Sequence, residues 1–217
     1  MTQRWPLIRA LAAVTLMGDV IFTLVCGAAQ FWRRDLDPLT APLSAYLTGP
    51  GGEYVRLAYY AMATGLFSLA IAGFLATPPR NRSALAAVLI GISAVALPPV
   101  AITTLYAHTA QEDLARYLHK LAAEITFLCL CFGMPLLSMR WRREPRLSRD
   151  SAGVVLAWAA FAWLWVYVIY HGLPSGSMQK VLIVLILAWL GWASWHLCVG
   201  QMRRDRAHTP QSPMNLM

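Results

Sequence analysis

Several histidines and carboxylates in this chain are of the types that carry out metal chemistry. Glu112 and His119 are seven residues apart, two turns of a helix, so they share one helix face. Imidazole nitrogens bind zinc, and a bound zinc ion lowers the pKa of its water to about 7. The sequence therefore predicts a candidate zinc site with three ligands, His108, His119 and His171. Asp37 or Glu112 would then act as the general base.

The same region also fits a purely structural role, and the residue pattern leaves both interpretations open. Glu112 precedes Arg116 by four residues, and Lys120 precedes Glu124 by four, a spacing typical of ion pairs on a helix surface. Thr109 and Glu112 have the spacing of a capping box, which predicts a helix that begins near residue 110.

The composition places all of these residues in a membrane protein. Of the 217 residues, 58% are hydrophobic and 13% are charged, and the mean hydropathy is +0.52. A soluble domain has about 25% charged residues. The apolar residues form continuous runs of about 20, the length of a helix that crosses a hydrocarbon core of about 30 Å. These features exclude a soluble enzyme, a secreted disulfide module, a disordered chain and a β-barrel.

The apolar runs predict an all-α fold, a polytopic bundle of six transmembrane helices in a single domain, residues 1–200. The spans are bounded by charged residues, Pro or Gly, and they cover about 7–31, 55–77, 84–106, 118–138, 152–170 and 178–200. The tail 201–217 is rich in Arg and Pro, and we expect it to be a flexible cytoplasmic end.

The basic residues predict the orientation of the chain. Assigning the loops alternately to two sides places twelve Lys and Arg on the side of both termini and six on the other side. Basic residues are retained in the cytoplasm, so we expect both termini there and a bacterial inner membrane as the location. The net charge of +8 is explained by these anchors and by anionic lipid head groups, so no nucleic-acid partner is expected.

Hydroxyl and imidazole groups concentrate on the opposite, outward side. All eight tyrosines and three of the five histidines fall in its loops or in the adjoining halves of the spans. An aromatic belt at the membrane surface is one explanation, and an outward-facing polar and aromatic pocket is the other. The residues expected to bind a ligand in such a pocket are Asp37, Ser44, Tyr59, Glu112, His119, Tyr167 and His171.

The longest outward loop, residues 33–54, has the pattern of a lid. Asp37 and Pro38 are typical of a helix start, with Asp as the cap and Pro at the first helical position. Leu43 and Tyr46 follow at helical spacing, which predicts a short amphipathic helix on the outer leaflet. This helix would cover the mouth of a pocket, or it would serve only as an interfacial anchor.

Two acidic residues fall inside predicted spans. Asp19 lies at the centre of the first span, where a charge is costly, so we expect it to be protonated or bonded to a neighbouring backbone. Pro98 and Pro99 would break the third span and free carbonyls for that bond. Glu124 is expected to be buried and paired with Lys120. The same acids and broken helix would also suit a proton or cation path.

Short motifs along the chain resemble a known family. They are Asp37-Pro38-Leu39, Pro42-Leu43-Ser44, His119 at the start of the fourth span, and His171-Gly172-Leu173 before Gln179-Lys180. Together they resemble the domain of unknown function 998 family of prokaryotic six-span membrane proteins, over about residues 8–200. The resemblance implies the six-helix fold and no activity. A weaker similarity, to alkaline-ceramidase-like zinc hydrolases, lacks the histidine pair four apart on a late helix.

Three functional hypotheses follow. The first is an inner-membrane protein, not an enzyme, that binds a lipid or another hydrophobic small molecule in the outward-facing pocket. The second is a metal-dependent hydrolase of membrane lipids, with zinc as its cofactor. The third is a proton-coupled transporter or channel built on Asp19 and Glu124. The sequence leaves open whether the protein is an enzyme, and whether it forms a homo-oligomer or binds a partner membrane protein.

Overall fold

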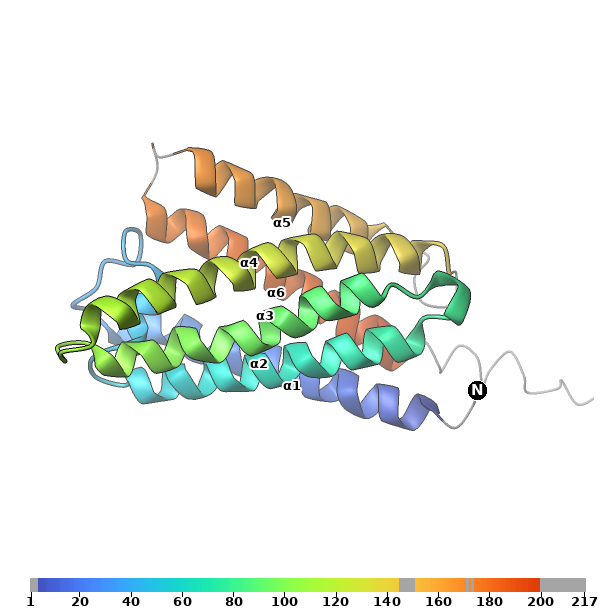
Figure 1. Ribbon diagram of the computed structural model, residues 1–217, viewed down its shortest axis with the longest axis horizontal. Coiled ribbons are helices and arrows are strands. Elements are labelled where there is room, and N and C mark those ends of the chain that lie inside the picture. The colour runs from blue at the N-terminus through green and yellow to red at the C-terminus, as the bar shows by residue number, and fades with distance from the viewer. Residues whose placement is uncertain (1–3, 145–150, 171, 173, 200–217) are drawn as a thin grey trace, which may run out of the picture.

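The computed structural model describes residues 4–144, 151–170, 172 and 174–199. Within these residues there is no strand, and the long helices are α1 (Trp5–Trp32), α2 (Gly52–Ala76), α3 (Ala84–Ile102), α4 (Glu112–Arg142), α5 (Ala152–Ile169) and α6 (Ser175–Val199). The short 3-10 helices are η2 (Leu43–Leu47), η3 (Pro79–Asn81) and η4 (Thr103–Tyr106). The long helices run alternately up and down along one axis (Figure 1).

Six helices of the described part are long and apolar enough to cross a membrane, with α3 and η4 together forming the span Ala84–Tyr106. The prediction of an all-α, multi-pass membrane protein is confirmed. The helices match the predicted spans within a few residues, except that α4 begins at Glu112, six residues before the expected span. The tail 201–217 lies outside the described residues, and the cytoplasmic orientation of the termini stays a prediction.

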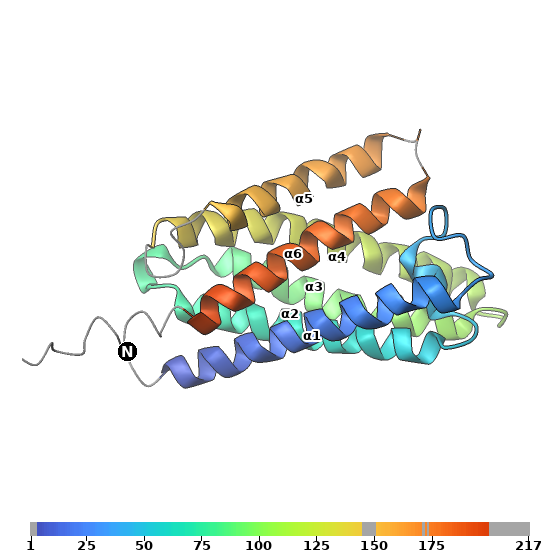
Figure 2. The same cartoon turned by 180° about the vertical axis from the view of Figure 1, so that it is seen from behind.

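Five of the long helices surround the interior, and α5 lies outside them. Helices α1, α2, α3 and α4 pack in chain order, α6 packs against α1, and α5 contacts α4 and α6 (Figures 1 and 2). Helix α5 carries Trp and other apolar side chains on its outer face, including exposed Trp158 and Ile169. Such a surface is suited to lipid. On its inner face, Ala157, Ala160 and Leu164 are buried against the neighbouring helices, so α5 is peripheral but still belongs to the packed core.

Helices α1 and α2 approach each other closely because small residues line their contact. A Cβ atom on Gly18 of α1 would lie 2.6 Å from the carbonyl oxygen of Ala61 on α2. The Thr15 hydroxyl, one turn earlier, donates a hydrogen bond of 3.0 Å to the carbonyl oxygen of Gly65. Membrane helices lack a hydrophobic driving force for association, so close backbone contact and interhelical hydrogen bonds hold such pairs together.

The segment between α1 and α2, residues 33–51, closes one end of the bundle, and we call it the cap segment. The expected amphipathic helix from Asp37 is wrong in type and position. Residues 37–41 form a single turn, and a 3-10 helix then covers Leu43–Leu47. Pro42 explains the interruption, because it has no N–H group and its ring would clash with the carbonyl of residue 38 in a continuous α-helix. Leu43, Tyr46 and Leu47 are buried, so η2 packs into the bundle end.

The cap segment is tied to α6 and to the end of α1. The N–H group of Leu43 donates to the side-chain oxygen of Gln179 at 3.0 Å, and the N–H group of Ser177 donates to the carbonyl of Leu39 at 2.9 Å. The buried Arg33 side chain donates to the carbonyl of Thr48. These bonds fix η2 over the interior.

The close contact at Gly18 makes a direct prediction. Gly18→Ala places a methyl group against the backbone of α2, so the helices must separate, and overpacking of this kind costs about 1–3 kcal/mol of unfolding free energy. Gly27→Ala on the same helix meets no atom within 4 Å and should not lower stability. Thermal denaturation of the two variants in one detergent measures the difference. Equal midpoints would contradict the close packing of α1 on α2.

Candidate functional site

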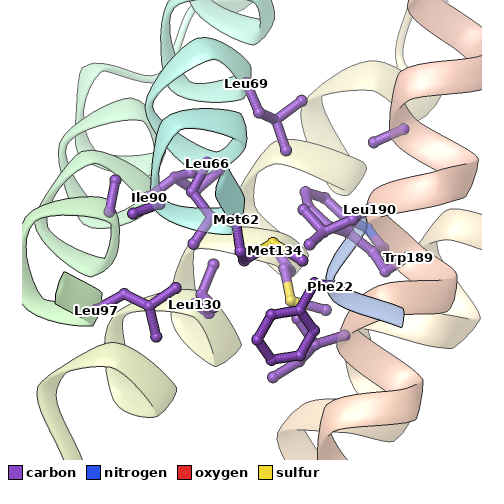
Figure 3. Packing of buried hydrophobic residues seen from close by; sticks show 14 of the residues in the cluster. Phe22, Met62, Leu66, Leu69, Ile90, Leu97, Leu130, Met134, Trp189 and Leu190 are labelled. Carbon is purple, nitrogen blue, oxygen red and sulfur yellow. The ribbon is translucent and has the colours of Figure 1, made fainter. Parts of the chain in front are cut away.

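A cavity of about 80 Å³ lies inside the bundle beneath the cap segment. Its wall is contributed by η2 and by the same five helices that surround the interior, α1, α2, α3, α4 and α6. Most of the lining side chains are apolar, and among them are Phe22, Met62, Leu66, Leu130, Ile186 and Leu190. Figure 3 shows Met62 and Leu66 of α2 on one side of this space, with Phe22 of α1, Leu130 of α4 and Leu190 of α6 around it.

The polar side chains of the cavity gather toward the capped end, except Thr126 of α4, whose hydroxyl donates to the carbonyl of Ala122 on its own helix. Ser44 belongs to η2, and Gln179 lies in the first turns of α6. His119 lies seven residues into α4, about 10 Å along the helix at about 1.5 Å per residue. By the same measure Leu66 of α2 and Leu190 of α6 lie about 20 Å from the helix ends nearest the cap. The cavity is thus polar near the cap and apolar toward the middle of the bundle.

The ring of His119 is held by the end of α3. Its Nδ1 atom lies 2.9 Å from the carbonyl oxygen of Val100 and 3.2 Å from the Thr103 hydroxyl oxygen. A carbonyl oxygen only accepts, so Nδ1 carries the proton and donates. The Thr103 hydroxyl donates to the carbonyl of Pro99 at 2.7 Å, so its oxygen also accepts from the imidazole. The remaining ring nitrogen, Nε2, has a lone pair and no partner within the described part of the chain.

The backbone carbonyl oxygen of Val100 is available as a hydrogen-bond acceptor because α3 ends nearby. The last carbonyls of an α-helix have no N–H group of their own helix to accept from. Here α3 gives way to the 3-10 helix η4 at Thr103, and His119 of the next helix bonds to one of these carbonyls. The end of α3 thereby fixes both the tautomer and the direction of a cavity side chain.

The other polar groups of the cavity are only partly bonded. The side-chain oxygen of Gln179 accepts from Leu43, which leaves the amide NH₂ group with two donors. The hydroxyl groups of Ser44 and Tyr59 make no hydrogen bond to other described residues. The Tyr59 ring packs against the Phe22 ring at a centroid distance of 5.1 Å. An apolar cavity with unpaired polar groups at one end is typical of a binding site for an amphiphile.

The structure brings three of the seven predicted ligand residues to the cavity. Ser44, Tyr59 and His119 line it. Tyr167 lies on the peripheral helix α5 and is not part of the wall. His171 lies outside the described residues, so its expected place in the site stays a prediction.

Asp37 and Glu112 have local structural partners instead. The carboxylate of Asp37 accepts from the N–H group of Leu39 at 3.0 Å and from the hydroxyl of Thr40 at 2.8 Å. The carboxylate of Glu112 accepts from the N–H group of His108 at 2.9 Å and pairs with Arg116 at 2.7 Å. Asp37 is exposed and Glu112 is partly exposed. Both side chains stabilise turns, and neither lines the cavity.

The predicted capping box is shifted by one residue. Glu112 reaches back to the N–H group of His108, whereas a capping box would use that of Thr109. His108 has a φ of 65°, a left-handed conformation that tightens the turn. Helix α4 therefore begins at Glu112, with Gln111 as its first flanking residue, and the expected start near residue 110 is displaced.

No cluster of three or more potential metal ligands occurs among His, Cys, Asp and Glu side chains of residues 4–144, 151–170, 172 and 174–199. His108 lies in the turn before α4, and His119 points its Nδ1 atom at Val100. The predicted zinc set of His108, His119 and His171 also needs a residue beyond the described ones. It stays a prediction.

The two intramembrane acids differ from each other. Asp19 is buried, with its Oδ2 atom near Gly191 of α6, but its Oδ1 atom has no hydrogen-bond partner within the described chain. The expected bond to a backbone carbonyl is absent there, and α3 continues as a helix through both prolines. Glu124 is wrongly predicted as buried: its side chain is 55% exposed and lies 3.9 Å from Lys120.

Comparison with protein families agrees with this architecture. A family model described as "Protein of unknown function (DUF998)" matches residues 6–196. The chain belongs to this family. The match extends from the first turn of α1 to the last turns of α6, so it includes the cavity and the cap segment. Comparisons with curated proteins and with solved structures gave no match.

Gln179 is a polar residue of the cavity wall that the sequence interpretation did not include among the candidate ligand contacts. It appeared only in the motif Gln179-Lys180. Apolar residues on the same face of α6 identify the position of Gln179. Ile183, Ile186 and Leu190 follow it at helical spacing and line the same cavity. An uncharged hydrogen-bonding side chain at the head of an apolar stripe in a span is the signal that identifies such a position.

The contact of His119 with Val100 predicts one tautomer. At neutral pH the ring should be uncharged, with the proton on Nδ1 and a lone pair on Nε2. Nitrogen-15 NMR of protein labelled at histidine measures both ring nitrogens, and a His119→Gln variant identifies the signals. A proton on Nε2 instead would contradict the arrangement of this site.

The cap segment should loosen in acid. The hydrogen bond from Arg33 holds the pKa of Asp35 below its usual value, and the N–H group of Leu39 does the same for Asp37. Since both pKa values are lowered in the folded state, their stabilisation is present above the ordinary pKa of 3.8 and is lost as the pH falls through the lowered values. Hydrogen exchange of residues 33–48, corrected for its intrinsic pH dependence, should rise below pH 3.8.

The matched control for this effect is the double variant Asp35→Asn, Asp37→Asn. It lacks both titrating groups, so exchange of its cap segment should already be faster at neutral pH and should change little in acid. An acid-induced rise of equal size in both proteins would show that other groups hold the segment.

Proposed function

We propose that this protein binds an amphiphilic molecule from the membrane in the cavity beneath the cap segment. The observation that carries the proposal is the cavity itself, with an apolar interior and unpaired polar groups at its capped end. The polar end of the ligand would lie among Ser44, His119 and Gln179. Its hydrocarbon would extend between α2, α4 and α6, along Leu66, Leu130 and Leu190.

The size of the cavity limits what it holds. Its volume of about 80 Å³ is smaller than the engineered cavity of about 150 Å³ that admits benzene. The head and first carbons of a chain fit this space, whereas a complete two-chain lipid does not. Met62 and Phe127 on the wall have rotatable side chains that can enlarge the space when a chain enters.

The orientation belongs to the same proposal. The end with the cap segment would face away from the cytoplasm of a bacterial inner membrane, as the excess of basic residues at the opposite end suggests. A ligand would then enter from the outer leaflet or the space beyond it. No metal or catalytic step is needed for this role.

Blocking the cavity should abolish binding. Ala123 of α4 lines the cavity, so Ala123→Phe fills the space where the chain lies. Leu121→Phe on the same helix is the control, because Leu121 is 39% exposed and is absent from the wall. Lipid extracts of each purified protein are compared by mass spectrometry. The same amphiphile should accompany the unsubstituted protein and the Leu121→Phe variant, and be reduced at least tenfold with Ala123→Phe.

Two outcomes would contradict the proposal. One is an unsubstituted protein, purified in a mild detergent, that carries no amphiphile beyond the bulk lipid mixture. The other is a folded Ala123→Phe variant that retains the same amphiphile at the same ratio. Circular dichroism and the thermal midpoint establish that the variant is folded.

A further inference from the structure

The hydrogen-bonding groups of the cavity specify more than an amphiphile. Building on the proposed function, we infer that the ligand has an uncharged head group with a hydroxyl, an alcohol on a hydrocarbon chain. The inference rests on which atoms of His119 and Gln179 are already bonded, and on the absence of charge from the wall.

His119 requires a donor from the ligand. Its Nδ1–H group is used by Val100 and Thr103, so Nε2 can only accept. The ring cannot turn this lone pair elsewhere without breaking both contacts. A ligand oxygen that carries a hydrogen satisfies Nε2, and an ether, ester or ionised carboxylate oxygen does not.

Gln179 supplies donors beside that acceptor. Its side-chain oxygen must face the N–H group of Leu43, so the amide NH₂ group is the part left for a ligand. The Ser44 hydroxyl donates or accepts as needed. One alcohol oxygen can donate to His119 and accept from Gln179 or Ser44, and so pairs groups that otherwise lack a partner in the described chain.

An anionic head group finds no counterion here. No Lys, Arg, Asp or Glu is among the residues that line the cavity. The nearest cation in sequence to Gln179 is Lys180, and its ammonium group donates to the side chain of Gln30 and to the carbonyl of Pro38. It also lies over the Tyr46 ring at 5.3 Å from the centroid. A carboxylate or phosphate in the cavity would therefore be desolvated without compensation.

Three sources share this head-group chemistry: straight-chain alcohols, prenols and acylglycerols. The test uses compounds with one chain length so that only the head group changes. Delipidated protein in detergent is loaded with tritiated 1-decanol, and unlabelled 1-decanol, decyl methyl ether and sodium decanoate compete for it. Farnesol and monodecanoylglycerol are the two further arms that separate the sources.

The expected result is that 1-decanol competes about tenfold better than its methyl ether, the effect of one hydrogen bond of about 1.4 kcal/mol. Decanoate at pH 8 should compete more weakly still. In His119→Leu the alcohol and the ether should compete equally, because the acceptor is gone. Leu121→Ala, a substitution on the exposed side of α4, should keep the tenfold preference.

The inference and the proposed function can fail separately. If none of the compounds displaces 1-decanol, or if 1-decanol does not bind, the proposed function fails with it. If decanoate or the methyl ether competes as well as the alcohol, the cavity binds amphiphiles but the hydroxyl specificity is wrong.

A second variant tests the same inference if the His119→Leu protein does not fold. Gln179→Glu keeps the oxygen that accepts from Leu43, but it replaces the amide donors with a second oxygen. It should weaken the binding of 1-decanol and weaken that of decanoate further. Unchanged binding of both compounds would overturn the assigned role of Gln179.

Discussion

The need to satisfy polar groups inside hydrocarbon governs this structure. Without water, a hydroxyl or ring N–H group in a span must find its partner within the protein. Thr15 and Thr126 meet this need with the carbonyl four residues earlier on their own helices, and the Trp141 ring donates to Thr77. Trp189 donates to Ser138 in the same way. The hydroxyl groups of Ser44 and Tyr59 beneath the cap segment have no such partner within the described chain, and neither have the buried Oδ1 atom of Asp19 and Oγ atom of Ser194. In the proposed function, a ligand would complete the bonding of the groups that line the cavity.

The cap segment couples the chain connection to the site. Its 3-10 helix buries Leu43, Tyr46 and Leu47 in the end of the bundle, and the same segment contributes Ser44 to the cavity. The bond between Leu43 and Gln179 also decides which atoms of Gln179 remain for other hydrogen bonds. One loop therefore closes the bundle and sets the chemistry of its polar end. This explains why a loop of this length is rich in buried side chains.

Much of the fold could be predicted from the sequence, but only part of the site could. The six spans and the position of Asp19 inside the first of them followed from hydropathy, length and Pro or Gly positions. For the loop of residues 33–54, a cover was one of two interpretations that the sequence left open. Tyr59 and His119 were found because they are polar and lie near the outward ends of their spans, and Ser44 because it lies in the loop expected to cover that end. Asp37 and Glu112 were assigned to the site on the same grounds, yet their carboxylates bond to the backbone of their own turns. Residues that lie at the same depth in the membrane can point in different directions, and the sequence does not give those directions.

By itself the sequence determined the membrane environment and the number of spanning helices, because these depend on the composition of contiguous residues. Only the tertiary structure decided that α5 contributes nothing to the cavity wall, that His119 bonds to Val100, and that Gln179 meets Leu43 from 136 residues away. The physical reason is that most of these helices are apolar on nearly all faces. Helix α4 is the exception, because Arg116, Lys120 and Glu124 give its first half a polar face. A helix with no polar face gives no sequence signal for its rotation about its axis, so packing against neighbours sets which residues face the cavity.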